Sequence, residues 1–279
     1  MDILFLLKAA FLGVVEGITE FLPISSTAHL LIVGDWLNFD AGADKVYEIA
    51  IQLGSILAVM WLYRQRLSQL CVGAIKRERA DLLFIRNVLL AFLPAAIIGF
   101  LFIKQIKQLL DGQFIVYAIT LVLGGLIMLW VESRPAMSKH SQADLSHQPQ
   151  RIEDISIKQA LIVGFAQCLA MIPGTSRSGA TIIAGMLAGI QRKTATEFTF
   201  FLAMPTMIAA TLYSLYKYGS ALSQSNLLAL LIGFVLAFLS ALVVVKALLA
   251  FVAKYSYRPF AWYRIIFGII VAAWVYQII

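Results

Sequence analysis

Two acidic residues and a run of hydroxyl side chains stand inside an otherwise apolar stretch at 13–29. Glu16 and Glu20 are four residues apart, so on a helix their carboxylates project from the same face. Pro23 interrupts that helix, because proline has no N–H to donate and its ring crowds the preceding turn. Hydroxyls then stand beside the unpaired N–H groups of a new helix start, at Ser25, Ser26 and Thr27. The stretch predicts a site for a metal ion and an anion.

A second group of polar residues interrupts the apolar sequence in the other half of the chain. After Pro173 come glycine, hydroxyl side chains and an arginine, at Gly174, Thr175, Ser176, Arg177, Ser178 and Thr181. Glycine lets a ligand approach the backbone closely, and the N–H groups at a helix start attract phosphate. Arg177 adds a planar fork of donors suited to bidentate phosphate binding. This segment therefore predicts a phosphate-binding site.

The composition indicates an integral membrane protein. Of 279 residues, 61% are hydrophobic and only 13% are charged, whereas soluble domains have about 25% charged residues. Crossing ~30 Å of hydrocarbon takes ~20 apolar residues, and runs near that length occur at 46–63, 87–103, 114–131, 195–216, 227–250 and 260–279. Six spans are predicted. The two cysteines, Cys71 and Cys168, are too few for a disulfide scaffold or a thiolate metal site.

The two polar segments look like copies of one another. A helix that enters the membrane, turns at the proline and leaves on the same side fits 3–33 better than a plain span, because protein must surround its polar groups. Along the second half, Gly13 matches Gly164, Glu16 matches Gln167, Pro23 matches Pro173 after a one-residue slip, Ser26 matches Ser176 and Thr27 matches Arg177. We therefore predict an internal duplication.

The predicted fold is an all-α integral membrane protein, a single membrane domain of residues 1–279 built from two repeats. Residues 1–132 form the first repeat, a hydrophilic linker follows at 133–156, and residues 157–279 form the second. Each repeat is expected to hold one re-entrant helical hairpin and three transmembrane helices. An odd number of spans turns the second repeat upside down, which gives inverted-topology repeats with both hairpin tips near the middle of the membrane.

The distribution of positive charge predicts the orientation. The most basic connection lies at 64–86, and most of the 22 lysine and arginine residues fall on its side of the membrane. The positive-inside rule then places the linker in the cytoplasm and both termini outside. Arg264 is counted with the cytoplasmic surface, whereas Arg177 belongs to neither surface. The net charge of +7 thus reports orientation, and we expect no nucleic-acid partner.

The charged residues inside the membrane need partners, because an isolated charge is costly there. Glu16, Glu20 and Arg177 would all be satisfied by a divalent cation bound together with a polyphosphate. Oxygen ligands favour Mg²⁺ or Ca²⁺ over Zn²⁺, and the two glutamates are the predicted metal ligands. A purely structural pairing of both glutamates with Arg177 would leave one negative charge over.

Three motifs resemble a known family. The pattern E-x-x-x-E at Glu16 and Glu20, P-x-S-S-T-x-H at 23–29 and P-G-x-S-R-S-G-A-T at 173–181 are similar to the undecaprenyl pyrophosphate phosphatase family of the bacitracin-resistance type, over essentially the full chain. One departure is Ala28, where glycine is expected before the histidine. The resemblance implies removal of one phosphate from undecaprenyl pyrophosphate at the bacterial plasma membrane, which recycles the lipid carrier for cell-wall synthesis and confers bacitracin resistance. It also implies dependence on a divalent metal and a site open to the periplasm.

The resemblance further implies roles for individual residues, and it leaves alternatives open. Glu16 and Glu20 take the role of the acidic motif, Ser26 and His29 are the candidate nucleophile and base, and Arg177 is the phosphate clamp. Either Ser26 attacks, activated by His29 or Glu20, or a water on the metal attacks directly. The rival from another class is a transporter or flippase for a lipid-linked phosphate, since inverted repeats with broken helices are transporter architecture. The oligomeric state is open, with a homodimer among the arrangements considered.

Overall fold

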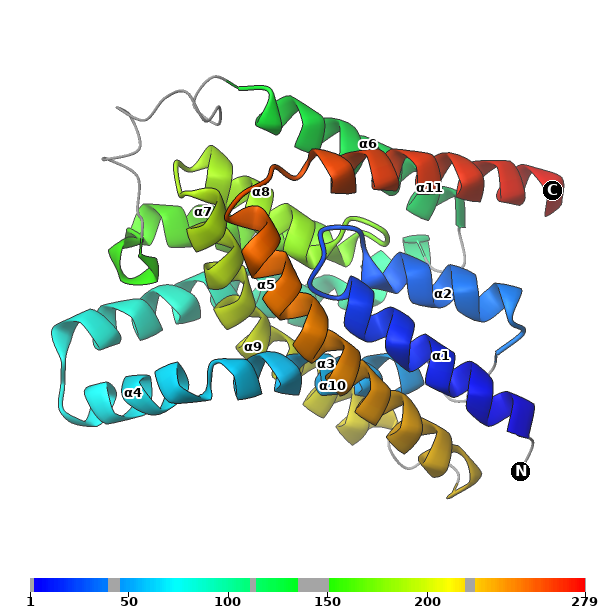
Figure 1. Ribbon diagram of the computed structural model, residues 1–279, viewed down its shortest axis with the longest axis horizontal. Helices are drawn as coiled ribbons and strands as arrows, with labels where there is room; N and C mark the ends of the chain where they lie inside the picture. Colours follow the sequence, from blue (N-terminus) through cyan, green and yellow to red (C-terminus); the bar gives the residue numbers. More distant parts are fainter. Residues whose placement is uncertain (1–2, 40–45, 111–113, 135–150, 219–223, 279) are drawn as a thin grey trace.

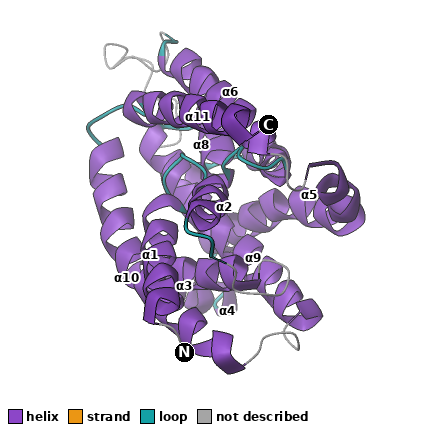
Figure 2. Cartoon of the chain, turned by 90° about the vertical axis from the view of Figure 1, so that its right-hand side faces the viewer, coloured by secondary structure: helices purple, strands orange, loops and turns teal. Residues whose placement is uncertain are grey.

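The computed structural model describes residues 3–39, 46–110, 114–134, 151–218 and 224–278, and helices are the only regular elements in these segments (Figure 1, Figure 2). The first half contains α1 (Ile3–Thr19), α2 (Ser26–Trp36), α3 (Val46–Leu62), α4 (Arg64–Ile75), α5 (Arg79–Leu110) and α6 (Phe114–Glu132). The second half contains the 3₁₀ helix η4 (Ile152–Asp154), α7 (Ile157–Gln167), the 3₁₀ helix η5 (Cys168–Met171), α8 (Arg177–Leu187), α9 (Arg192–Tyr218), α10 (Gln224–Val252) and α11 (Arg258–Ile278). The all-α prediction is confirmed for the described residues.

Five helices in the described part of the chain are long and apolar enough to cross a membrane. They are the segments Arg79–Phe102, Phe114–Glu132, Arg192–Ser214, Leu227–Val252 and Arg258–Tyr276. Five of the six predicted spans correspond to these segments. The remaining one, predicted at 46–63, forms α3, a helix of 17 residues that is shorter than the other five. The chain is therefore a multi-pass membrane protein by the length and apolarity of its helices.

The basic segment at 64–86 is helical, which corrects its interpretation as a plain connection. It holds α4 and the first turns of α5, and these pack closely, since a Cβ on Gly73 would meet the carboxylate of Asp81. Leu70 and Phe84 are buried, while most basic residues of the segment are exposed. Each helix thus buries one apolar face, and a hydropathy average over both faces conceals it.

Two helical hairpins carry the segments that the sequence singled out. α1 and α2 lie side by side in Figure 1, and α7 and α8 also pack against each other. Each hairpin packs on a long helix of the opposite half, α1 on α10 and α7 on α5. Glycine allows both crossings, because a Cβ on Gly13 would meet the backbone of Gly233, and a Cβ on Gly164 would meet the backbone of Ala91.

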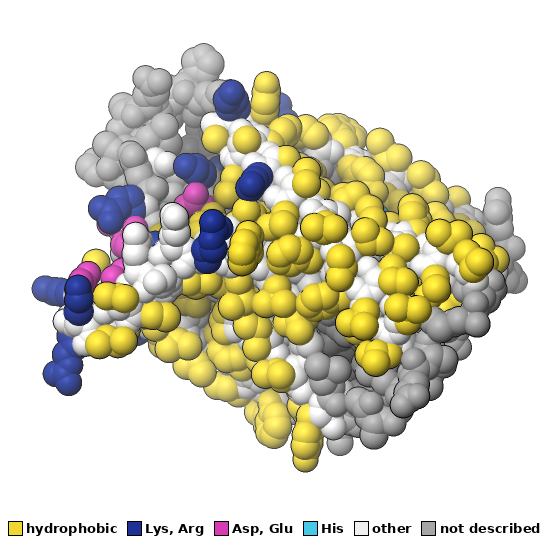
Figure 3. Space-filling view, turned by 60° about the horizontal axis from the view of Figure 1, so that its bottom comes forward, with side chains coloured by type: hydrophobic (Ala, Val, Ile, Leu, Met, Phe, Trp, Pro, Cys, Tyr) yellow, Lys and Arg dark blue, Asp and Glu magenta, His cyan; other side chains and the backbone are white. Residues whose placement is uncertain are grey.

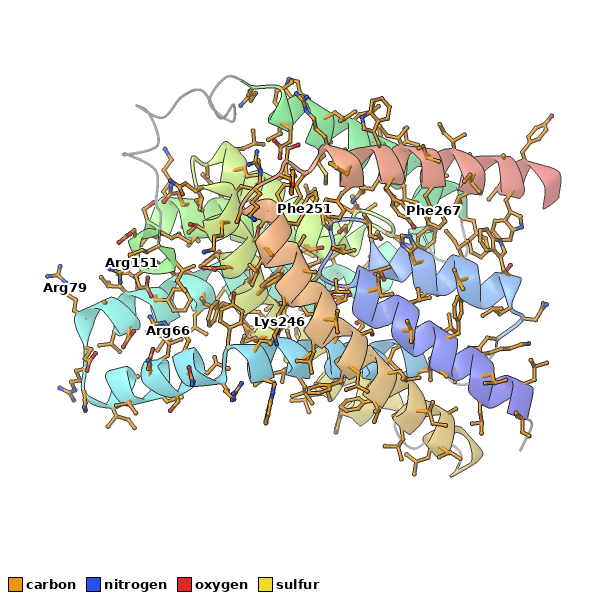
Figure 4. The ribbon with its side chains drawn as sticks, viewed as in Figure 1. Arg66, Arg79, Arg151, Lys246, Phe251 and Phe267 are labelled. Carbon is orange, nitrogen blue, oxygen red and sulfur yellow. The ribbon has the colours of Figure 1, made fainter. Side chains whose placement is uncertain are left out.

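The charged side chains gather at one end of the molecule. On the face drawn in Figure 3, lysine, arginine and acidic residues lie toward one end, and a broad hydrophobic surface covers the rest. Arg66 bonds to Asp81 at 2.9 Å and to Glu153 at 2.6 Å. Figure 4 shows Arg66 at the same end as Arg79 and Arg151. A charged end beside an apolar surface is typical of a protein embedded in a membrane.

Candidate active site

The tips of the two hairpins share an uncommon positive φ at the capping serine. Ser25 caps α2 with φ 72°, and its hydroxyl accepts the N–H of Ala28 at 3.4 Å. Ser176 caps α8 with φ 71°, and its hydroxyl accepts the N–H of Gly179 at 3.1 Å. A left-handed φ is uncommon for residues other than glycine. Both caps satisfy one donor of the new helix and leave the first N–H groups of α2 and α8 at the tips.

These caps correct the alignment of the two segments by one residue. Ser25, not Ser26, has the position of Ser176, and Ser26 has the position of Arg177. The offset that relates Gly13 to Gly164 is therefore kept through the tip, without a slip. The prolines suggested the slip because Pro23 stands two residues before its cap, whereas the second-hairpin proline stands three residues before Ser176.

Glu20 joins the two hairpins. The hydroxyl of Ser26 donates a hydrogen bond to Oε2 of Glu20. Arg177 of α8 donates from Nη2 to Oε1 of the same carboxylate at 3.1 Å. All three side chains are largely removed from solvent, which strengthens the ion pair. A hydroxyl, a carboxylate and a guanidinium from opposite halves of the chain thus meet at one point.

Glu16 lies one helical turn before this point, and its carboxylate makes no hydrogen bond to the described residues. The N–H of Glu20 donates to the carbonyl of Glu16 at 2.9 Å, so the helical path continues and both side chains share a face. Glu16 is 0% exposed, and among the described residues neither of its carboxylate oxygens has a hydrogen-bond partner. A buried carboxylate without a hydrogen-bond donor is costly, so Glu16 is a candidate ligand for a cation.

His29 is held away from Ser26. Its Nδ1 lies 2.7 Å from the carbonyl oxygen of Ser25, and its Nε2 lies 2.7 Å from the hydroxyl of Tyr263. The ring stacks on Phe267 with centroids 4.4 Å apart, and Figure 4 marks Phe267 on α11 near α2. Both ring nitrogens are therefore engaged, and of the two candidate bases it is Glu20 that contacts the serine hydroxyl.

A comparison with known protein families assigns this chain to one of them. A family model described as "Bacitracin resistance protein BacA" matches residues 9–270, a range that includes both hairpin tips and nearly all of the chain. The chain belongs to this family.

Named relatives cover almost the same range. A Bordetella avium protein named "Undecaprenyl-diphosphatase" is 60% identical over 275 residues, covering 97% of each chain. "Undecaprenyl-diphosphatase 2" of Shewanella oneidensis is 53% identical and covers 97% of this chain and 98% of its own. "Undecaprenyl-diphosphatase 3" of Acinetobacter baylyi is 52% identical and covers 95% and 96%.

Of the other residues singled out in this BacA family chain, Ser178 connects the two tips, whereas Thr181 and Thr27 do not. Ser178 donates to the carbonyl of Leu22 at 2.9 Å and so ties α8 to the first hairpin. Thr181 donates to the carbonyl of Arg177 at 2.9 Å, inside its own helix. Thr27 is exposed on α2, whereas Glu20 and Ser26 are buried. The expected contact of Thr27 and Thr181 with a ligand stays a prediction.

Gly174 and Thr175 contribute carbonyl groups to a contact that the sequence did not reveal. Arg264 of α11 is 1% exposed and lies between the tips of both hairpins and α6. Its guanidinium donates to the carbonyl oxygens of Pro23 (3.1 Å), Thr120 (3.0 Å), Leu121 (3.3 Å), Gly174 (3.3 Å) and Thr175 (3.1 Å). This one side chain therefore fixes the two tips relative to each other in the BacA fold.

The buried position of Arg264 corrects its assignment to the cytoplasmic surface. The positive-inside count treated Arg264 as a surface residue, and such a count fails where a guanidinium is satisfied by backbone carbonyls. The sequence did indicate that Arg264 is buried, because this residue stands inside the apolar run at 260–279. A charged residue within a span faces the protein interior by default.

Proposed function

We propose that this chain hydrolyses undecaprenyl pyrophosphate to undecaprenyl phosphate and inorganic phosphate. Relatives with this name are 52–60% identical over almost the whole chain. The observation that carries the proposal is the shared carboxylate of Glu20, which holds the Ser26 hydroxyl on one side and the Arg177 guanidinium on the other. These are the groups that attack on a pyrophosphate requires: a nucleophile, a proton acceptor and a cation.

The proposed first step is attack by the Ser26 hydroxyl on the terminal phosphorus. Glu20 takes the proton, the new Oγ–P bond forms, and the bond to the bridging oxygen breaks, releasing undecaprenyl phosphate. Arg177 keeps donors besides the one on Glu20 and neutralises charge on the equatorial oxygens. Water then hydrolyses the phosphoserine. His29, bonded to Ser25, holds the backbone before the nucleophile.

A divalent cation, Mg²⁺ or Ca²⁺, fits the residues present. Glu16 is buried with both carboxylate oxygens unpartnered among the described residues, and Glu20 shares its face. In the described part of the chain no three His, Cys, Asp or Glu side chains gather as a metal site. Mg²⁺ commonly uses one or two carboxylates and completes its shell with substrate phosphates and water. When bound by Glu16 and Glu20, the cation would supply charge neutralisation for the pyrophosphate.

We propose that the two halves are inverted-topology repeats with re-entrant hairpins, a site open to the periplasm and both termini outside, in the bacterial plasma membrane. The matching caps at Ser25 and Ser176 support the duplication, as does the exchanged packing of α1 on α10 and α7 on α5. The basic α4–α5 end supports a cytoplasmic location for that side. A homodimer stays a prediction, which the mass of the detergent-solubilised protein tests.

The decisive experiment is phosphate release from undecaprenyl pyrophosphate by the purified protein in detergent, where no membrane gradient exists. We expect release by the wild type and loss of release in Arg177→Ala. A lipid-phosphate carrier, the second function considered, releases no phosphate from either protein.

Acid-quenched mixtures then identify the nucleophile. Phosphate bound to Ser26 in the wild type supports the serine mechanism. Full turnover by Ser26→Ala eliminates it in favour of direct attack by water.

A further inference from the structure

We propose that Tyr263 positions Ser26 through His29 and is therefore required for the reaction without contacting the pyrophosphate. The kinetic part of this inference rests on the proposed function. Its structural part rests on the contacts of three side chains and is tested separately.

The hydrogen bonds of His29 fix its tautomer. A carbonyl oxygen only accepts, so the 2.7 Å contact of Nδ1 with the carbonyl of Ser25 places the ring proton on Nδ1. In the neutral ring Nε2 is then an acceptor, and the phenol of Tyr263 donates to it at 2.7 Å. The phenol thus stabilises the tautomer that can bind the Ser25 carbonyl.

That carbonyl belongs to the residue directly before the nucleophile. Ser25 has φ 72°, a conformation that a serine adopts only when its surroundings hold it there. Its carbonyl accepts two donors from His29, the ring Nδ1–H and the backbone N–H at 3.3 Å. The direction of the Ser26 side chain toward Glu20 follows from this backbone. Tyr263 of α11 therefore acts on Ser26 indirectly. Its hydroxyl bonds to His29, His29 bonds to the Ser25 carbonyl, and the Ser25 backbone orients Ser26.

Removing the hydroxyl of Tyr263 distinguishes its positioning role from the packing of its ring. The phenol ring stacks on His29 with centroids 5.6 Å apart and on Phe267 with centroids 5.9 Å apart. Tyr263→Phe keeps both ring contacts and removes only the donor to Nε2. The substitution removes a single oxygen atom from a side chain that is 43% exposed, so it changes the packed volume little. Tyr276→Phe is the matched control, because Tyr276 lies on the same helix and is 84% exposed.

The first test reads the tautomer directly. The chain has three histidines, so replacing His140 and His147 by Gln leaves His29 as the only imidazole for ¹⁵N NMR. We expect a protonated Nδ1 and an unprotonated Nε2 in this background. Tyr263→Phe is expected to increase the Nε2–H form, which free imidazole side chains favour in water, while Tyr276→Phe leaves the spectrum unchanged. An Nε2–H ring in the parent protein, or an identical spectrum in Tyr263→Phe, overturns the proposal.

The second test separates positioning from substrate contact. Loss of one hydrogen bond is expected to lower kcat of Tyr263→Phe about tenfold, with KM within about twofold of the wild type. A raised KM with unchanged kcat shows that Tyr263 binds substrate instead, which overturns the proposal. A wild type that releases no phosphate refutes the proposed function, and the tautomer measurement still decides the link between Tyr263 and His29.

Discussion

Ser25 and Ser176 cap their helices with φ values of 72° and 71°, yet the residues that follow them differ completely. In the first hairpin the next residue is Ser26, and in the second it is Arg177. Both side chains bond to the same carboxylate, that of Glu20. One backbone turn, used twice, thus presents a hydroxyl from one half and a cation from the other.

The helices before the tips differ in the same way. Glu16 of the first hairpin corresponds to Gln167 of the second, and both are buried. Neither Glu16 oxygen has a partner among the described residues, and the same holds for Nε2 of Gln167, although its Oε1 accepts from Thr206 at 3.3 Å. The first hairpin therefore carries the two acids that are the proposed ligands of a cation, whereas the second carries a neutral amide at the position of Glu16. The backbone that the two hairpins share determines where the groups lie. The residues that differ between them determine what each half contributes.

Removing the shared carboxylate is expected to have the largest effect. Glu20→Gln keeps the size of the side chain but loses the proton acceptor for Ser26 and the charge that pairs with Arg177. We expect kcat for phosphate release to fall by about 10²–10⁴-fold. Glu197→Gln in α9 is the control, since Glu197 lies beside Lys193 and outside the site. Wild-type turnover by Glu20→Gln would contradict the assignment.

Replacing Arg177 by another positively charged residue should have an intermediate effect. Arg177→Lys loses the planar fork that donates to Glu20 and that we propose also binds phosphate. Loss of a charge-assisted hydrogen bond corresponds to roughly a 10–100-fold fall in kcat/KM. The measurement is steady-state phosphate release, compared with Arg192→Lys at the Glu132 ion pair on the other side of the second hairpin. Equal losses in both variants would show that the effect is general destabilisation.

Arg264, which connects the two tips, is expected to contribute mainly to the stability of the fold. In Arg264→Lys a single ammonium replaces a guanidinium that donates to five carbonyl oxygens. Carbonyls left unpaired in the interior should lower the free energy of unfolding by about 3 kcal/mol. Thermal unfolding in detergent measures this, with the exposed Arg134→Lys as control. An unchanged Tm would show that the tips do not depend on Arg264.

The caps should show the smallest effect, and the two hairpins should respond alike. Ser25→Ala and Ser176→Ala each lose the side-chain cap, which costs about 1 kcal/mol, while substitution of either residue by glycine costs only a few tenths. Glycine also relieves the left-handed backbone. If Ser26→Ala instead matched Ser176→Ala in its effect on unfolding, the corrected alignment of the two tips would be wrong.

Much of this arrangement was predictable from the sequence. Glu16, Glu20 and Arg177 are charges in apolar surroundings, and their cost in a membrane requires that they meet a partner. The spans follow from apolar runs that have no other explanation. The helices at 64–86 were not apparent, because each buries only one apolar face and a hydropathy average conceals it. The apolar run around Arg264 indicated its burial, but its carbonyl partners were not predictable, because they come from distant segments. His29 was expected as a candidate base from the family resemblance, but the phenol that hydrogen-bonds to its Nε2 belongs to Tyr263, 234 residues away in the sequence.

The two hairpins build one site through Glu20, and a double-mutant cycle tests this link most directly. Phosphate release is measured for the wild type, Glu20→Gln, Arg177→Met and the double variant. If the two groups act as one unit, the double variant loses no more activity than the weaker single variant. Losses that multiply independently would contradict the shared site.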